Sequence, residues 1–356
     1  MSPASPSNRT GGRYFEDFRL GEAIRHATPR TLSAGDISLY SALYGGRFAL
    51  QSAETFARAV GYPASPVDDL LTFHIVFGKT TPDVSLNAVA NLGYADCRFL
   101  QPVYSGDTLS AFSEVIGLKE NSDRKSGVVH VRTRGENQHG RTVLEYVRWA
   151  MVRKRDFGAA TPETRVPELP EAVAVGDLGA ACPPIDAGAF AGDLSGSERR
   201  FEDYSAGERI DHVDGVTVEE AEHMMAARLY QNVAKVHFNQ WSEGQGRFQR
   251  RLVYGGHVIS LARALSFNGL ANAFHIAAIN AGRHVASVFA GDTIFAWSEV
   301  VMTAPLPGRG DVGGLRLRTI AAKNRPCADF PLRDGETYDS SVVLDFDYWA
   351  LVPRRP

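Results

Sequence analysis

The sequence predicts an α+β protein built from two tandem copies of one domain. The first observation is internal repetition, because the segment Arg13–His26 recurs as Arg199–His212 with eight identical residues in register. Two further pairs of segments repeat in the same order at offsets of 185 and 200 residues: Gly106–Val115 with Gly291–Val300, and Val143–Ala150 with Val343–Ala350. The second observation is that helical patterns come first in each copy and strand patterns afterwards, which is typical of an antiparallel sheet packed on helices.

The repeats define where each domain begins and ends. They predict an N-terminal domain at residues 13–155 and a C-terminal domain at residues 199–356. Residues 156–198 are rich in Ala, Gly, Pro and acidic side chains without helical or strand periodicity, and this predicts a linker. Residues 1–12 are mainly Ser, Pro, Asn and Gly with no apolar run of the kind a secretion signal needs, and they predict a disordered leader.

The helical stretches follow from apolar residues at helical spacing. In the first copy this spacing predicts a helix over Ser33–Leu43 and, after a break at Gly45-Gly46, a second over Ala53–Val60. In the second copy it predicts helices over Val218–Tyr230 and Val258–Leu265. Most apolar side chains on these faces are expected to be core.

The strands of the first copy are read from β-branched and alternating runs. These runs are Thr108–Ile116, Val128–Thr133 and Val143–Val152, the last closed by a basic tripeptide. The matching blocks of the second copy predict the same strand order there.

Composition excludes several classes of function. A net charge of -3 gives no electrostatic reason to expect nucleic acid or an anionic membrane as partner. No apolar run approaches the roughly 18 residues that a membrane-spanning helix requires. Cys97, Cys182 and Cys327 are an odd set without paired spacing, which argues against a disulfide framework or a zinc site and fits a reducing cytoplasm.

The two copies differ where they could carry chemistry. In an ungapped alignment, His237 of the second copy faces Gln51 of the first, and Asn232 faces Gly46. A duplicated enzyme that keeps one working site would show this asymmetry. The second copy is therefore expected to be catalytic, and the first to have lost catalysis and to shape the substrate pocket.

The motifs resemble a known family. The order of helix, loop with His, longer helix and strand, together with Arg98–Leu109 (RFLQPVYSGDTL), resembles the MaoC-like (R)-specific enoyl-CoA hydratases. This resemblance implies a double hotdog fold, in which an antiparallel sheet wraps a central helix in each half. At finer grain the chain resembles the bacterial mesaconyl-CoA hydratases (β-methylmalyl-CoA dehydratases) in the stretches Phe73–Lys79, Ser85–Cys97 and Val253–Ala264.

The resemblance implies an activity. The reaction is reversible addition of water to 2-methylfumaryl-CoA (mesaconyl-CoA), giving β-methylmalyl-CoA, in glyoxylate assimilation by the ethylmalonyl-CoA pathway. An acyl-CoA substrate is then the expected partner, and no metal or redox cofactor is implied, since CoA enters as part of the substrate.

The family's catalytic motif, Gly-Asp-x-Asn-Pro-x-His, maps onto the second copy with one important departure. His237 matches the histidine and is expected to act as acid and base, because the ordinary pKa of histidine lies near 6.5. Asn232 stands where the family has aspartate; it can hold water but cannot take its proton. Gly256, with Gly255 before it, matches the family's oxyanion-binding glycine in a loop that leads into the Val258–Leu265 helix.

Several residues are weaker candidates for the substrate pocket. The pair Asp68-Asp69 occupies the loop equivalent to Gly255-Gly256 and could replace the missing carboxylate, although helix-capping acids are the plainer interpretation. His257 is a possible second proton carrier. A substrate with a free carboxylate favours an arginine fork, for which the sequence offers four candidates: Arg47, Arg228, Arg263 and Arg283.

Three alternatives remain open from the sequence. The first is a general (R)-specific enoyl-CoA hydratase for unbranched chains. The second is a hotdog thioesterase, which would need Asp36 or Glu222 as its carboxylate. The third is a non-catalytic acyl-CoA-binding protein. Hotdog proteins pair their sheets, and the two copies in one chain already form one such pair; further assembly of the hydratase into a homo-oligomer (a dimer or higher) is expected.

Overall fold

The computed structural model describes residues 5–6, 11–160 and 162–356. Of the predicted leader, residues 1–4 and 7–10 lie outside the described residues. Ser5–Pro6 form a two-residue strand, β1, that pairs in parallel with β2.

One long sheet carries both halves of the chain. Its strands in the first half are β2 (Ala23–Thr31), β3 (Ala88–Phe99), β4 (Thr108–Glu120), β5 (Ser126–Glu136) and β6 (Thr142–Arg153). Those in the second half are β7 (Arg209–Thr217), β8 (His275–His284), β9 (Thr293–Pro305), β10 (Val312–Lys323) and β13 (Val342–Pro353). With β1 they form an 11-stranded sheet in the order β1-β2-β4-β5-β6-β3-β8-β13-β10-β9-β7. A separate hairpin pairs β11 (Arg333–Asp334) with β12 (Thr337–Tyr338).

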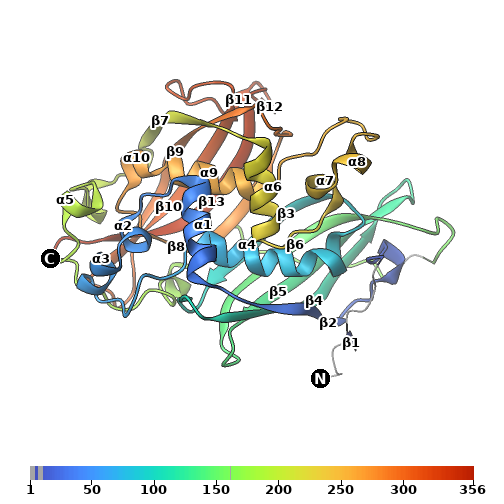
Figure 1. Cartoon of the computed structure of the whole chain (residues 1–356), viewed down its shortest axis with the longest axis horizontal. Coiled ribbons are helices and arrows are strands. Elements are labelled where there is room, and N and C mark those ends of the chain that lie inside the picture. Colours follow the sequence, from blue (N-terminus) through green and yellow to red (C-terminus); the bar gives the residue numbers. More distant parts are fainter. Residues whose placement is uncertain (1–4, 7–10, 161) are drawn as a thin grey trace.

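The two halves join through their equivalent strands, β3 and β8. These strands pair antiparallel, with Tyr94 opposite Gly282 and Arg98 opposite Ala278. The strand order on one side of this junction mirrors the order on the other side, so the sheet has an approximate twofold arrangement (Figure 1).

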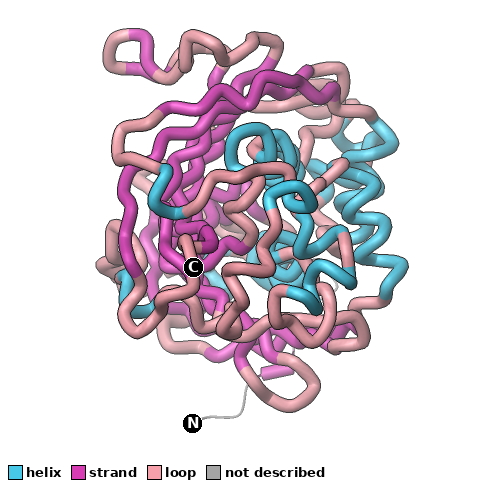
Figure 2. The backbone as a smooth tube through the Cα atoms, turned by 90° about the vertical axis from the view of Figure 1, so that its left-hand side faces the viewer, coloured by secondary structure: helices cyan, strands magenta, loops and turns pink. Residues whose placement is uncertain are grey.

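The helices cover one face of the sheet (Figure 2). In the first half they are α1 (Ala34–Tyr44), α2 (Ala49–Ser52), α3 (Glu54–Ala59) and α4 (Asp69–Thr80), with the short turns η1 (Phe15–Asp17) and η2 (Thr81–Ser85). In the second half they are α6 (Glu220–Leu229), α7 (Lys235–Phe238), α8 (Gln240–Glu243), α9 (Gly255–Leu265) and α10 (Phe267–Leu270), with the turn η4 (Phe201–Asp203). The segment between the halves holds η3 (Val175–Asp177) and α5 (Gly192–Ser195).

The central helices α4 and α9 are equivalent elements. They begin at Asp69 and Gly255, which are 186 positions apart, the same offset that separates η1 from η4 and β2 from β7. Helix α4 packs on β4 and α9 packs on β9. Each half is therefore an antiparallel sheet around a central helix, as the resemblance implied.

The predicted helices and strands are present, with two differences at their bounds. The helix expected over Ala53–Val60 is present as α3, but a four-residue helix that was not expected, α2, precedes it and is separated from it by the extended residue Ala53. The stretch expected as a loop before Val258 is already helical from Gly255, so the two glycines belong to the first turn of α9.

A continuous apolar core spans both halves. It includes side chains of α1, α4, α6 and α9 in one cluster. At its centre the hydroxyl groups of the equivalent residues Tyr44 and Tyr230 are hydrogen-bonded at 2.6 Å. The three cysteines are free thiols and all are buried.

Candidate active site

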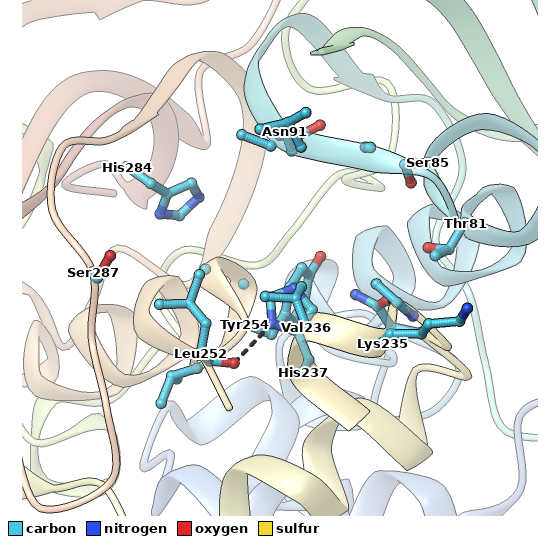
Figure 3. Close-up of a pocket in the computed structure, with 18 of the residues that line it drawn as sticks. Thr81, Ser85, Asn91, Lys235, Val236, His237, Leu252, Tyr254, His284 and Ser287 are labelled. Atoms are coloured by element: carbon cyan, nitrogen blue, oxygen red, sulfur yellow. Dashed lines mark hydrogen bonds between the residues drawn. The ribbon is translucent and has the colours of Figure 1, made fainter. Parts of the chain in front are cut away.

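A cavity of about 590 Å3 lies between the two halves and is lined by both. The first half contributes the end of α4, η2 and β3, and the second half contributes α7, the start of α9 and the end of β8 (Figure 3). Three residues predicted as catalytic, His237, Asn232 and Gly256, all line this cavity, as does Gly255.

His237 lies on the short helix α7 with its ring held by the backbone. Its Nδ1 atom lies 2.8 Å from the carbonyl oxygen of Leu252 (Figure 3). A carbonyl can only accept, so Nδ1 must carry the proton, and the lone pair of the imidazole is on Nε2. Burial lowers the pKa of His237 to about 4, although the Leu252 carbonyl opposes this shift. The ring is therefore neutral at pH 7 and can accept a proton at Nε2.

Asn232 lies at the end of the turn that follows α6. It is buried, and its backbone N–H donates to the Ala227 carbonyl at 2.9 Å. Its side-chain Oδ1 accepts the backbone N–H of Ala234 at 3.2 Å, which fixes the orientation of the amide. The Nδ2 group is left without a partner among the described residues, so it can donate a hydrogen bond to a water molecule in the cavity.

The first turn of α9 presents backbone N–H groups to the cavity. Tyr254 precedes the helix without a side-chain cap, and the N–H groups of Gly255 and Gly256 have no acceptor in the described part of the chain. A Cβ atom on Gly256 would overlap the rings of Tyr254 and His74. Glycine is thus required by close packing, and the open helix N-terminus can stabilise a developing oxyanion.

Sequence reasoning missed a second histidine in the cavity, His284 at the end of β8. Its Nε2 atom lies 2.6 Å from the hydroxyl of Tyr94 on β3 of the other half. The Tyr94 ring lies across Gly282, where the Cβ atom of any other residue would overlap the ring. Because the glycine allows this close approach, the Tyr94 hydroxyl reaches His284 further along β8. Burial lowers the pKa of His284 to about 4, and His237 lowers it further, which places the two rings in one electrostatic environment. The pairing of β3 with β8 brings these residues together, and no local pattern in either strand signals it.

The proposed substitute for the missing carboxylate, Asp68-Asp69, is not in the cavity. Asp68 caps α4 by accepting the N–H of Leu70 at 2.9 Å. The Asp69 carboxylate accepts the N–H of Ile276 at 2.8 Å and lies 2.9 Å from His275 Nδ1, at the start of β8. Asp68 is therefore engaged at its own helix and Asp69 with β8 of the second half, and neither lines the cavity with His237, contrary to that expectation.

His257 and Arg47 are also placed away from the cavity, which corrects their expected roles in substrate binding. The His257 side chain is fully buried and its Nδ1 lies 2.9 Å from the hydroxyl of Tyr44. Arg47 donates to Asn268 at 2.7 Å and lies over the ring of Phe267. Among described lining residues the long cationic side chains are instead Lys235 and Arg153, so none of the four arginines chosen from the sequence lines this cavity.

The carboxylates that a thioesterase would need are elsewhere. Asp36 lies on α1, where it is bonded to Arg30 and to the helix cap at Ser33. Neither it nor Glu222 lines the cavity, and Glu243 on α8 is the one carboxylate among the described lining residues. Within the described ranges there is no cluster of His, Cys, Asp and Glu side chains suited to a metal ion, and no helix has the length and apolarity to cross a bilayer.

Comparison with known proteins identifies the family. The sequence profile of mesaconyl-CoA hydratase matches residues 5–331. The chain belongs to the mesaconyl-CoA hydratase family. It is 61% identical over 347 residues to a β-methylmalyl-CoA dehydratase of Chloroflexus aurantiacus, covering 97% of this chain and 98% of that protein. It is 59% identical, also over 347 residues, to a mesaconyl-CoA hydratase of Cereibacter sphaeroides, with 96% and 98% covered.

Solved structures show the same architecture. A putative MaoC domain dehydratase from Chloroflexus aurantiacus superposes with a TM-score of 0.95 at 60% identity, covering 98% of this chain and all of that one. A Mycobacterium tuberculosis protein described as having a double hotdog fold superposes with a TM-score of 0.73 at 27% identity, covering 97% and 99%. The fold is therefore the double hotdog that the resemblance implied.

Proposed function

We propose that the protein catalyses the reversible hydration of mesaconyl-CoA to β-methylmalyl-CoA, acting as a hydro-lyase. The observation that carries this proposal is the convergence of a neutral histidine with a free Nε2 and an uncapped glycine helix N-terminus on one cavity. Family membership and the names of the relatives point to the same reaction.

The mechanism assigns one role to each group. His237 Nε2 takes a proton from a water molecule that Asn232 holds through its Nδ2 group, as the water oxygen bonds to the β-carbon. The electron pair of the double bond moves toward the thioester oxygen, which accepts the N–H of Gly256 at the positive end of α9. The imidazolium of His237 then returns the proton to the α-carbon, so one residue serves as base and acid.

The scheme needs no redox cofactor, because adding water across a double bond is redox-neutral, and it includes no metal; CoA enters as part of the substrate. We further propose a cytoplasmic location, since the three buried thiols suit a reducing compartment, and assembly of the double-hotdog chain into a homo-oligomer.

The test is loss of the enoyl-thioester ultraviolet absorbance when the purified protein meets mesaconyl-CoA, with crotonyl-CoA in parallel and a thiol reagent to detect free CoA. Fast loss with mesaconyl-CoA and no CoA release is expected. Preference for crotonyl-CoA would favour a general hydratase, and release of CoA would favour a thioesterase. Binding without turnover would contradict the hydro-lyase proposal.

A further inference from the structure

Arg148 on β6 is a buried cation without an anionic partner. Its side chain is 0% exposed, and no ion pair to it is present in the described part of the molecule. The buried carboxylate of Asp83 on η2 is engaged by His26, at 2.7 Å from Nδ1. Isolated buried charges are costly, so an arginine in this setting needs an anion from elsewhere or a strong network of acceptors.

The acidic side chains that act on Arg148 carry no charge at neutral pH. They are the phenols of Tyr146 and Tyr254. Burial raises the pKa of Tyr146 to about 12 and raises that of Tyr254 well above its usual value. The guanidinium is thus surrounded by neutral groups.

The neutral acceptors of Arg148 include residues of the cavity wall. Its guanidinium donates to Thr80 Oγ1 at 2.6 Å, to Ser85 Oγ at 3.3 Å and, weakly, to Asn91 Oδ1 at 3.5 Å. It also lies 4.3 Å above the centre of the Phe77 ring. Ser85, Asn91 and Phe77 all line the cavity, so the cation stands directly behind this wall.

These contacts orient hydrogen-bond donors toward the cavity. Because the oxygens of Ser85 and Asn91 accept from Arg148, the Ser85 hydroxyl hydrogen and the Asn91 amide hydrogens are free to donate elsewhere. Thr81 beside them is 1% exposed and lines the cavity, and its hydroxyl has no partner among the residues that the structure describes. Figure 3 shows Thr81, Ser85 and Asn91 together on ribbons of the first half, while His237 and Lys235 come from α7 of the second.

We propose that Thr81, Ser85 and Asn91, backed by the charge of Arg148, form the subsite for the free carboxylate of the substrate. This inference rests on the proposed function, which calls for a dicarboxylic acyl-CoA. Arg148 acts through Ser85 and Asn91 and is a specificity-determining residue that does not touch the reacting atoms. The subsite belongs wholly to the first half, so each half supplies one part of substrate recognition.

The experiment compares mesaconyl-CoA with tiglyl-CoA, which carries a methyl group in place of the free carboxylate. The readout is the ratio of kcat/KM for the two substrates in wild type, Ser85→Ala, Thr81→Val and Arg148→Met. Ser85→Ala and Thr81→Val are each expected to lower this ratio by roughly 10- to 100-fold, because a hydrogen bond to the charged carboxylate is lost. Activity toward tiglyl-CoA should be unchanged or higher. Ser205→Ala, an exposed serine that does not line the cavity, should leave the ratio within about twofold of wild type, as expected for a position away from special features.

A purely structural role for these residues would lower kcat/KM for both substrates equally and leave the ratio unchanged, which would overturn the proposal. Arg148→Met is the variant most at risk of misfolding. If it misfolds, Ser85→Ala and Thr81→Val decide the outcome. Binding of two unreactive analogues, methylsuccinyl-CoA and 2-methylbutyryl-CoA, gives a second readout; only the first should weaken in Ser85→Ala. If wild type hydrates neither substrate, the proposed function itself fails, whereas hydration of mesaconyl-CoA with unaltered ratios removes only the subsite.

Discussion

The N-termini of α4 and α9 are equivalent by position but opposite in chemistry. At α4, Asp68 caps the helix and Asp69 binds the neighbouring strand, so carboxylates already occupy the positive end of the helix. At α9 the equivalent positions are Tyr254 and Gly255, no side chain caps the helix, and its N–H groups face the cavity. The same fold thus yields one closed end and one end able to receive an oxyanion.

The pair His237 and Gln51 repeats this contrast. The histidine bonds through Nδ1 to the Leu252 carbonyl and keeps Nε2 free, whereas the Gln51 amide donates to the Phe274 carbonyl. On the proposed mechanism, the first half has no base at the position equivalent to His237 and its helix terminus is filled, while its η2 and β3 line the cavity. This contrast is what we expect if one copy keeps the catalytic groups and the other contributes to the substrate-binding surface.

Replacing the base should have the largest effect. His237→Gln installs the residue of the first half, and kcat for mesaconyl-CoA hydration should fall by about 10^2- to 10^4-fold, the usual contribution of a general base. Steady-state kinetics on folded protein measure this. The reciprocal control, Gln51→His, should neither add activity nor remove it, because α4 stays capped; full activity in His237→Gln would refute the assignment.

Closing the oxyanion site should have the second largest effect on kcat. In Gly256→Ala the added methyl overlaps the rings of Tyr254 and His74, so the N–H must shift, and kcat should fall by about 10^2-fold, as for loss of an oxyanion donor. Leu70→Val alters the equivalent position of α4 and serves as the control. Equal losses of kcat in the two variants would show that packing alone, and not oxyanion stabilisation, explains the result.

Removing the Asp69 carboxylate at the N-terminus of α4 should lower the stability of the fold and leave catalysis unchanged. Asp69→Asn weakens the contacts with the Ile276 N–H and His275, and should lower the free energy of unfolding by about 1–3 kcal/mol. Urea unfolding measures this loss. If kcat/KM also fell by more than tenfold, the first helix terminus would have a catalytic role that the structure does not indicate.

Acid should destabilise the fold through its buried neutral histidines. Burial lowers the pKa of His237 and His284 to about 4 and that of His74 and His257 to about 3, against an ordinary value of 6.5. Between these values the unfolded chain binds more protons, so this stability is full above pH 6.5 and declines as the pH falls toward 4. Asp68, whose pKa burial raises to about 6, opposes the trend as a single group. The melting temperature should therefore drop between pH 7 and pH 5; a flat or rising profile would contradict the neutral state of these rings.

Much of the fold and part of the site could be predicted from the sequence. Repeated segments, helical spacing and strand runs depend on neighbours in the chain, and the motif around His237 predicted three residues that line one cavity. Side-chain direction could not be predicted, since His257 follows Gly256 directly yet points into the core. The proposed carboxylate subsite and His284 were missed for a related reason, because η2, β3 and β8 become neighbours of α7 only through tertiary packing.

The most direct test of the division of labour is a crystal structure with the unreactive analogue methylsuccinyl-CoA. This division of labour places the thioester oxygen at the Gly256 N–H, the β-carbon facing His237 Nε2, and the free carboxylate on Ser85 and Thr81 of the other half. An acyl group bound instead at the capped end of α4, beside Gln51 and Asp69, would contradict it.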